Sequence, residues 1–171
     1  LFDLHCDTIG ECCKAKMPLR KNDFHISLEK AKDIESYTQV FAIWIPDELR
    51  KQSAVNYFNK VCDYYENELK QNKSLITPYT AAGEKDGRVK AILAVEGGAA
   101  LGGKIDGLYS LYERGVKILT LTWNAENELG FGCQSGVEDG LKPLGKRLLK
   151  DMAANKIVAD VEKRKVLSKE I

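Results

Sequence analysis

The feature of this sequence that most constrains its fold is the regular alternation of short apolar runs with amphipathic segments. Five runs have the length and composition of buried strands, and they lie at residues 1–5, 38–45, 90–96, 116–122 and 156–161. Almost continuous apolar runs are typical of strands buried on both faces, as in parallel sheets. We therefore predict an α/β fold with a parallel sheet. The fifth run is apolar enough for a central strand, but the charged residues after it supply no sixth strand, so the first and fifth strands of this chain are expected to lie at open edges.

The segments between these runs carry helical periodicity. The longest covers residues 47–71, where apolar residues recur at steps of three and four and predict one buried stripe. The stripe consists of Val55, Phe58, Cys62, Tyr65 and Leu69. Three shorter helices are expected at residues 28–34 (capped by Ser27), 104–114 and 141–155. Strands that alternate with helices in this way indicate βα units.

Two architectures accommodate such units, the doubly wound sheet and the (β/α)8 TIM barrel. A doubly wound nucleotide-binding sheet has a glycine-rich loop after its first strand, whereas the turn here reads H-C-D-T-I-G-E. In a barrel, polar residues at the carboxyl ends of several strands converge on one mouth. Because this sequence places polar residues at several strand ends, the barrel is favoured, with about five of its eight βα units in the 171 residues.

Composition narrows the classes of function. The 26 Lys and Arg residues nearly balance the 25 Asp and Glu residues, so the chain lacks the excess of positive charge that is typical of proteins that bind nucleic acid. No apolar run approaches the roughly 18 residues of a membrane span. The five cysteines form an odd set without a C-x-x-C pair, which favours reduced thiols and a cytoplasmic location.

Candidate metal ligands stand at two strand ends. His5 and Asp7 are two residues apart, so their side chains share one face of a strand and can bind one ion. Glu96 follows the apolar run A-I-L-A-V, where a carboxylate is costly to bury unless it is paired or metal-bound. A histidine in a polar turn and a glutamate in a salt bridge remain the alternatives.

A second group of polar residues follows the fourth strand. Trp123, Asn124 and Asn127 are weaker candidates for substrate contacts, since asparagines also serve as turn residues and Trp123 as rim packing. His25 precedes a capped helix and is interpreted as a structural histidine. Cys6 is expected to point to the opposite face of its strand from the two candidate ligands, so we do not predict a nucleophilic role for it.

Five motifs occur in one order along residues 1–161: F-D-L-H-C-D-T, Q-V-F-A-I-W-I, A-I-L-A-V-E-G-G, G-V-K-I-L-T-L-T-W-N and G-L-K-P-L-G-K-R-L-L-K-D-M. Together they resemble the membrane (renal) dipeptidase family, peptidase family M19. The resemblance implies a TIM barrel of the metal-dependent hydrolase type with two zinc ions. By this analogy His5 and Asp7 bind one zinc and Glu96, the catalytic carboxylate, bridges both. The reaction would be hydrolysis of a dipeptide by a metal-bound hydroxide.

The sequence departs from the family pattern at two places. Trp123 stands where family members often carry a histidine, and the family's Ser-His after the fifth strand is replaced by the charged run E-K-R-K. Residues 1–161 are therefore expected to form the N-terminal part of a metallo-dipeptidase barrel, and residues 162–171 a charged helical tail. The remaining strands are expected from the same polypeptide or from a partner chain, including a second copy.

Three functions fit these observations. The first is a dinuclear zinc dipeptidase, which this chain alone would support poorly. The others are a non-catalytic fragment or pseudoenzyme of that family, and an α/β module that binds a single cation. Metal content distinguishes them, because they predict about two zinc ions per chain, fewer than one, or one hard cation.

Overall fold

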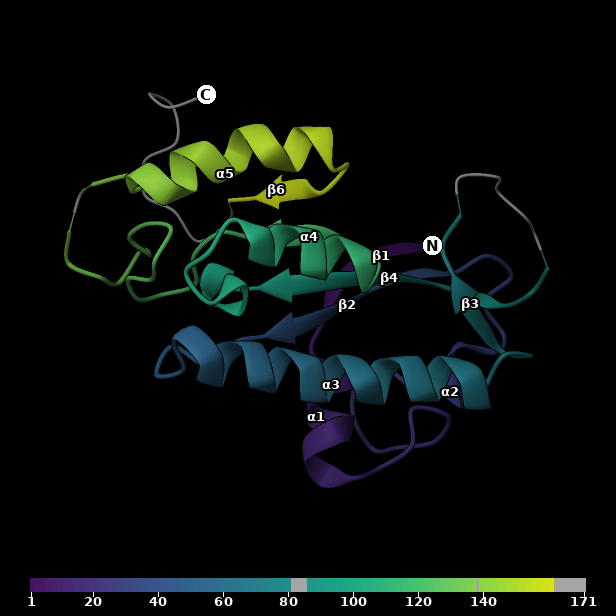
Figure 1. Ribbon diagram of the computed structural model, residues 1–171. Coiled ribbons are helices and arrows are strands. Elements are labelled where there is room, and N and C mark those ends of the chain that lie inside the picture. Colours follow the sequence, from purple (N-terminus) through teal and green to yellow (C-terminus); the bar gives the residue numbers. More distant parts are fainter. Residues whose placement is uncertain (81–85, 138, 162–171) are drawn as a thin grey trace. The chain divides into compact units, whose positions relative to one another are not determined.

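The computed structural model describes residues 1–80, 86–137 and 139–161 (Figure 1). Strands and helices alternate along these residues. The strands are β1 (Phe2–Cys6), β2 (Thr38–Trp44), β3 (Ile76–Pro78), β4 (Val89–Glu96), β5 (Val116–Thr120) and β6 (Val158–Asp160). The helices are α1 (Thr8–Ala15), α2 (Leu28–Ala31), α3 (Lys51–Gln71), α4 (Asp106–Glu113) and α5 (Pro143–Ala154), with a 3-10 turn at Gly98–Leu101.

The strands form one sheet in the order β1-β2-β4-β5-β6, with β3 paired to β4. The pairings of β1 with β2, β3 with β4 and β5 with β6 are all parallel. The predicted α/β fold with a parallel sheet is thus confirmed, and each of the five predicted strands lies within about two residues of an observed one. The short strand β3 and the helix α1 were not predicted. The predicted charged helix at residues 162–171 lies outside the described residues.

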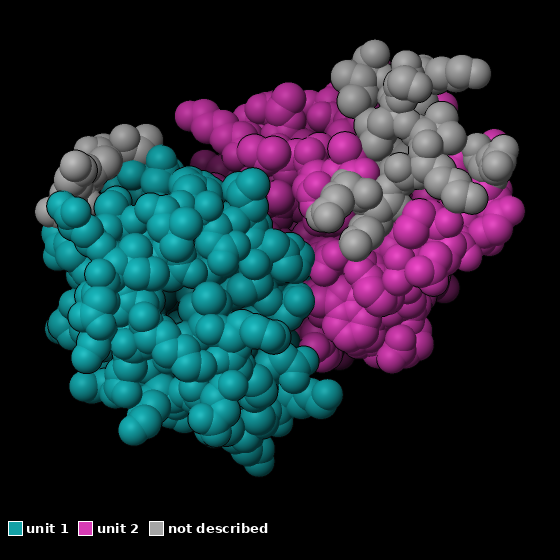
Figure 2. All heavy atoms as spheres, turned by 180° about the vertical axis from the view of Figure 1, so that it is seen from behind, with its two compact units in different colours: residues 1–43, 60–93 teal, residues 44–59, 94–171 magenta. Residues whose placement is uncertain are grey.

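The chain divides into two compact units, coloured teal and magenta in Figure 2. Unit 1 comprises Leu1–Ile43 and Lys60–Leu93, and unit 2 comprises Trp44–Asn59 and Ala94–Ile171. No helix in the described part of either unit is long and apolar enough to cross a membrane.

In unit 1, the buried face of α3 packs in the core. The ring of Tyr65 lies 6.1 Å from that of Phe41 on β2, measured between centroids. The predicted stripe is confirmed at Cys62 and Tyr65, but Leu69 is only half-buried because Glu68 takes its place on the buried face. The carboxylate of Glu68 accepts hydrogen bonds from the backbone N–H of Leu19 at 2.8 Å and from the Asn72 amide at 3.2 Å. These bonds satisfy a buried charge and hold the segment after α1 against α3.

The helix α1 was not predicted from the sequence, because the segment T-I-G-E-C-C-K-A contains few strong helix formers. Tertiary burial stabilises it instead, since Ile9 and Cys12, three residues apart, are both fully buried. The next helix, α2, begins as predicted with Ser27, whose hydroxyl accepts a hydrogen bond from the Lys30 N–H at 3.3 Å.

In unit 2, β5 and β6 pack against α4 and α5. Leu119 and Leu121 on the β5 side and Leu148 and Met152 on α5 are almost completely buried. Pro143 occupies the first turn of α5, where its missing N–H leaves no broken hydrogen bond. The loop after β5 contacts the segment between β2 and α3, where the Asp47 carboxylate accepts a hydrogen bond from the Ala125 N–H at 3.2 Å.

One expectation about burial was wrong. The first strand was predicted to be buried, yet Phe2 is 51% and Leu4 70% exposed. The fifth predicted strand was expected at an open edge of the sheet, and Val158 in the corresponding strand β6 is 61% exposed. β1 and β6 are the two ends of the strand order, so in the described residues each pairs with only one neighbour. The register of β1 against β2 also shifts between Asp3 and Cys6, and at this irregularity two successive residues, Leu4 and His5, are exposed.

Candidate metal centre

His5 and Asp7 lie at the carboxyl end of β1, where the strand passes into α1. The His5 Nε2 atom is 3.4 Å from Asp7 Oδ1, and both side chains are about half exposed, at 43% and 58%. Asp7 is the N-cap residue of α1, but its side chain makes no capping hydrogen bond. The backbone carbonyl of Asp7 accepts from Gly10 and Glu11 instead. The carboxylate is therefore directed to the imidazole rather than to the helix.

Glu96 is the last residue of β4 and is only 7% exposed. The residues that follow it must be glycines for steric reasons. Gly97 has a φ of +112°, and a Cβ at Gly98 would lie 2.1 Å from Leu129 Cδ1 and 2.7 Å from the Leu121 carbonyl. The backbone and side chains of other segments therefore lie close to this strand end. A carboxylate buried here needs a compensating partner.

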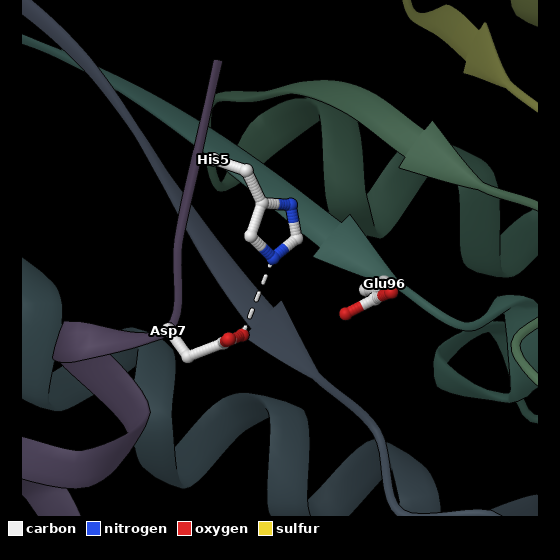
Figure 3. A group of neighbouring side chains, drawn as sticks. All are labelled: His5, Asp7 and Glu96. Atoms are coloured by element: carbon white, nitrogen blue, oxygen red, sulfur yellow. Dashed lines mark ion pairs between the residues drawn. The ribbon is translucent and has the colours of Figure 1, made fainter. Parts of the chain in front are cut away.

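His5, Asp7 and Glu96 are drawn together in Figure 3, where the imidazole and the two carboxylates point toward one another. One ligand atom from each of the three residues lies within 4.8 Å of the other two. Imidazole nitrogen and carboxylate oxygen are both ligands that zinc takes in proteins. The three side chains named from the sequence as metal ligands thus have the spacing and chemistry to hold an ion.

A cavity of about 480 Å³ in unit 1 opens beside the first two of these residues. It is lined by Asp3, His5, Cys6, Asp7, Thr8, Glu11, Phe24, His25 and Ile26. His25, interpreted from the sequence as structural, is exposed and lines this cavity. Cys6 is 8% exposed, and burial raises the pKa of its thiol to about 12. A thiol with so high a pKa stays protonated at neutral pH, which agrees with the expectation that Cys6 is no nucleophile.

The three weaker candidates lie in unit 2. The ring of Trp123 packs edge-on against Trp44, at 5.1 Å between centroids. The Asn124 side-chain oxygen accepts a hydrogen bond from the Cys133 thiol at 3.4 Å. The side chain of Asn127 donates to the Leu121 carbonyl at 2.8 Å and accepts from the N–H of Leu129 at 2.8 Å. Asn127 thus shapes its own loop, and a substrate contact for any of the three stays a prediction.

Sequence reasoning missed a polar pair at the neighbouring strand ends. The hydroxyl of Thr120, the last residue of β5, donates to the carboxylate of Asp160 at the end of β6, at 2.5 Å. The sequence predicted a strand over the segment V-K-I-L-T-L-T, so it placed Thr120 near the end of a strand. Its partner was not predicted, because Asp160 belongs to another strand that is 40 residues away in the chain.

Parallel strands with polar side chains at their carboxyl ends are the arrangement of the active sites of enzymes built on the TIM barrel. The model of the membrane dipeptidase family, peptidase family M19, matches residues 1–165, and the chain belongs to this family. The resemblance seen in the five sequence motifs is thereby confirmed.

Solved structures agree with this assignment. A family M19 metallopeptidase, dipeptidase AC, is 23% identical over 95% of this chain and 57% of its own, with a TM-score of 0.83. A metallopeptidase from Rhodobacter sphaeroides, bound to a phosphinate mimic of the dipeptide L-Ala-D-Ala, is 20% identical over 96% and 58%, with a TM-score of 0.85. The chain has the α/β fold of part of a TIM barrel, and it spans less than three fifths of either structure's length.

Proposed function

We propose that the protein carrying this chain is a zinc-dependent dipeptidase with a dinuclear site. The observation that carries the proposal is the convergence of His5, Asp7 and Glu96 within 4.8 Å, at the strand ends of a family M19 fold. The dipeptide substrate is supported by the family and by the phosphinate dipeptide mimic in the Rhodobacter sphaeroides structure.

The three candidate ligands would have different roles in binding the two ions. His5 and Asp7 would hold one ion from the same side, and Glu96, with two carboxylate oxygens, would bridge to the second. The ions supply Lewis-acid polarisation of the scissile carbonyl and activation of a water molecule as the nucleophile. The burial of Glu96 keeps its charge in a region of low dielectric, where its attraction for a cation is stronger than in water. The contact of 3.4 Å between His5 Nε2 and Asp7 Oδ1 orients both side chains before an ion binds.

The test is zinc content in matched variants. We expect His5→Ala to lose most bound zinc, because the variant removes the only nitrogen ligand of the group. His25→Ala is the control, since it removes the only other histidine of the chain. Both proteins are loaded with zinc, dialysed and analysed for metal per chain. Unchanged zinc in His5→Ala would show that the site assignment is wrong.

The same measurement on the unsubstituted chain separates the rival functions. About two zinc ions per chain would support the dinuclear site, and one hard cation such as Mg²⁺ would support a single-cation module. Less than one ion of any kind would support a non-catalytic fragment. Hydrolysis of simple dipeptides by the 171 residues alone is expected to be weak, because His5, Asp7 and Glu96 supply the second ion with only the bridging carboxylate.

We also propose a cytoplasmic location. Its support is that all five cysteines are free thiols, three of them buried. Reduced cysteines are the norm where glutathione and thioredoxin keep thiols reduced. Immunolocalisation of the native protein tests this, and recovery from an extracellular or periplasmic fraction would contradict it.

A further inference from the structure

The last residue of β2, Trp44, lies beside the candidate metal ligand Glu96. The N–H of Ile45 donates to the Glu96 carbonyl at 2.8 Å, and in a parallel pair this bond sets Trp44 level with Glu96. A Cβ at Gly97 would lie 3.3 Å from Ile45 Cβ, which agrees with this register. Level residues on neighbouring strands are about 4.8 Å apart and point to the same face. The indole of Trp44 therefore emerges on the face of the sheet that carries the Glu96 carboxylate.

The surface that this indole offers is apolar. Trp44 is partly exposed, whereas its Nε1 atom is buried and has no hydrogen-bond partner among the described residues. Any side-chain surface that Trp44 exposes is therefore made of carbon atoms. A surface of this kind contacts a bound molecule by packing against apolar groups and not by hydrogen bonding.

Contacts within unit 2 hold the indole in place. Its ring packs edge-on against the ring of Trp123, at 5.1 Å between centroids. The loop that carries Trp123 is tied to the segment after β2 at two points. The Asp47 carboxylate accepts a hydrogen bond from the Ala125 N–H at 3.2 Å. The Arg50 guanidinium donates to the Glu126 carbonyl at 2.6 Å. A ring that is already fixed in this way loses little conformational entropy when a ligand packs against it.

We propose that Trp44 is a specificity-determining residue, whose ring packs against an apolar side chain of the bound dipeptide. In the proposed function, the scissile carbonyl group is held beside Glu96, and both side chains of a dipeptide begin within a few bonds of that group. The substrates that this site prefers are therefore dipeptides with a bulky apolar side chain, because such a side chain removes more apolar surface from water than alanine does. The inference deepens the proposed function and rests on it.

The test compares ligands that differ only in one apolar side chain. Phosphinate mimics of L-Ala-D-Ala, L-Leu-D-Ala and L-Ala-D-Leu are titrated into the zinc-loaded chain by calorimetry. We expect one leucine mimic to bind about tenfold more tightly than the alanine mimic. Trp44→Ala should reduce this ratio of affinities to within about twofold, because the ring is gone. Trp44→Phe keeps an aromatic ring and should retain a ratio of about threefold or more.

The ratio separates specificity from damage to the metal centre, since such damage weakens the binding of all three mimics alike. An unchanged ratio in Trp44→Ala would overturn the inference, and so would equal binding of the three mimics to the unsubstituted chain. Tyr109→Ala removes an exposed aromatic ring on α4 and is the matched control, in which the ratio should not change. If circular dichroism shows that Trp44→Ala does not fold, Trp44→Gln replaces it with the same expectation.

A failure of the proposed function gives a different result. His5→Ala and the zinc-free chain are titrated alongside. Mimics that bind these two as tightly as the zinc-loaded chain would contradict the metal centre as the binding site. Zinc-dependent binding with the same ratio in Trp44→Ala would contradict the role of Trp44 alone. Absence of binding to the zinc-loaded chain would contradict both proposals.

Discussion

The strands β4 and β6 have similar apolar sequences but different surroundings. In β4, the run from Ala91 to Val95 is buried throughout, with Leu93 2% exposed. In β6, Val158 is 61% exposed, although the run K-I-V-A-D-V reads as strongly as a core strand. β4 pairs with strands on both sides, whereas β6 ends the strand order of the described residues. Burial of an apolar strand residue is therefore decided by its neighbours in the sheet and not by its own composition.

The largest change in the free energy of unfolding is expected when a buried residue of β4 and an exposed residue of β6 are each replaced by alanine. Leu93→Ala removes a fully buried side chain and leaves a cavity, so the free energy of unfolding should fall by about 3 kcal/mol. Val158→Ala removes a side chain that is mostly in water and should cost less than about 0.5 kcal/mol. Urea unfolding followed by circular dichroism measures both. Similar losses for the two variants would contradict the difference in burial.

A smaller effect is expected at the buried charge of unit 1. Glu68→Ala leaves the N–H of Leu19 without its acceptor, and we expect a loss of about 2 kcal/mol in the free energy of unfolding. Asn67→Ala, an exposed neighbour on the same helix, is the control. Hydrogen exchange at the Leu19 amide should rise in Glu68→Ala alone. An unchanged exchange rate would show that this contact does not hold the segment after α1.

Buried and exposed side chains also occur within a single strand, β1. The thiol of Cys6 is buried, whereas Phe2, Leu4 and His5 are exposed. Burial raises its pKa to about 12, so above about pH 9 the thiol ionises in the unfolded chain before it does so in the folded one. The unfolded state then binds fewer protons, and stability falls as pH rises, by about 1 kcal/mol for this group at pH 10. Cys6→Ala should show a shallower decline of stability between pH 8 and 10. An identical slope in both proteins would rule out the contribution.

The smallest change in stability is expected at the exposed edges. Leu4 and Val158 are 70% and 61% exposed, so replacement of both by lysine should alter the free energy of unfolding by less than about 0.5 kcal/mol. Edge strands with apolar side chains invite pairing with other strands, and lysine discourages it. Light scattering after size exclusion should show self-association of the chain that the double variant reduces. A monomeric chain would contradict the expected pairing of these edges.

Local sequence predicted the alternation of strands and helices and the three candidate metal ligands. The apolar runs and the helical stripe report burial over a few neighbouring residues, which is why β2, β4 and α3 were located within a few residues. The spacing of His5 and Asp7 and the glycines after Glu96 are local signals as well. Family motifs added what spacing alone does not contain, namely the class of reaction.

The tertiary structure decided which of these elements are interior and what holds them. The helix α1 exists because Ile9 and Cys12 are buried by other parts of unit 1, although its own residues favour helix weakly. Glu68 is buried on an apolar stripe because the Leu19 amide, 49 residues away in the chain, satisfies its carboxylate. Thr120 meets Asp160 only because β6 pairs in register with β5. Hydrophobic pattern and propensity act over a few residues, whereas strand order and register follow from free energies summed over the whole sheet, so these contacts exist only once the chain has folded.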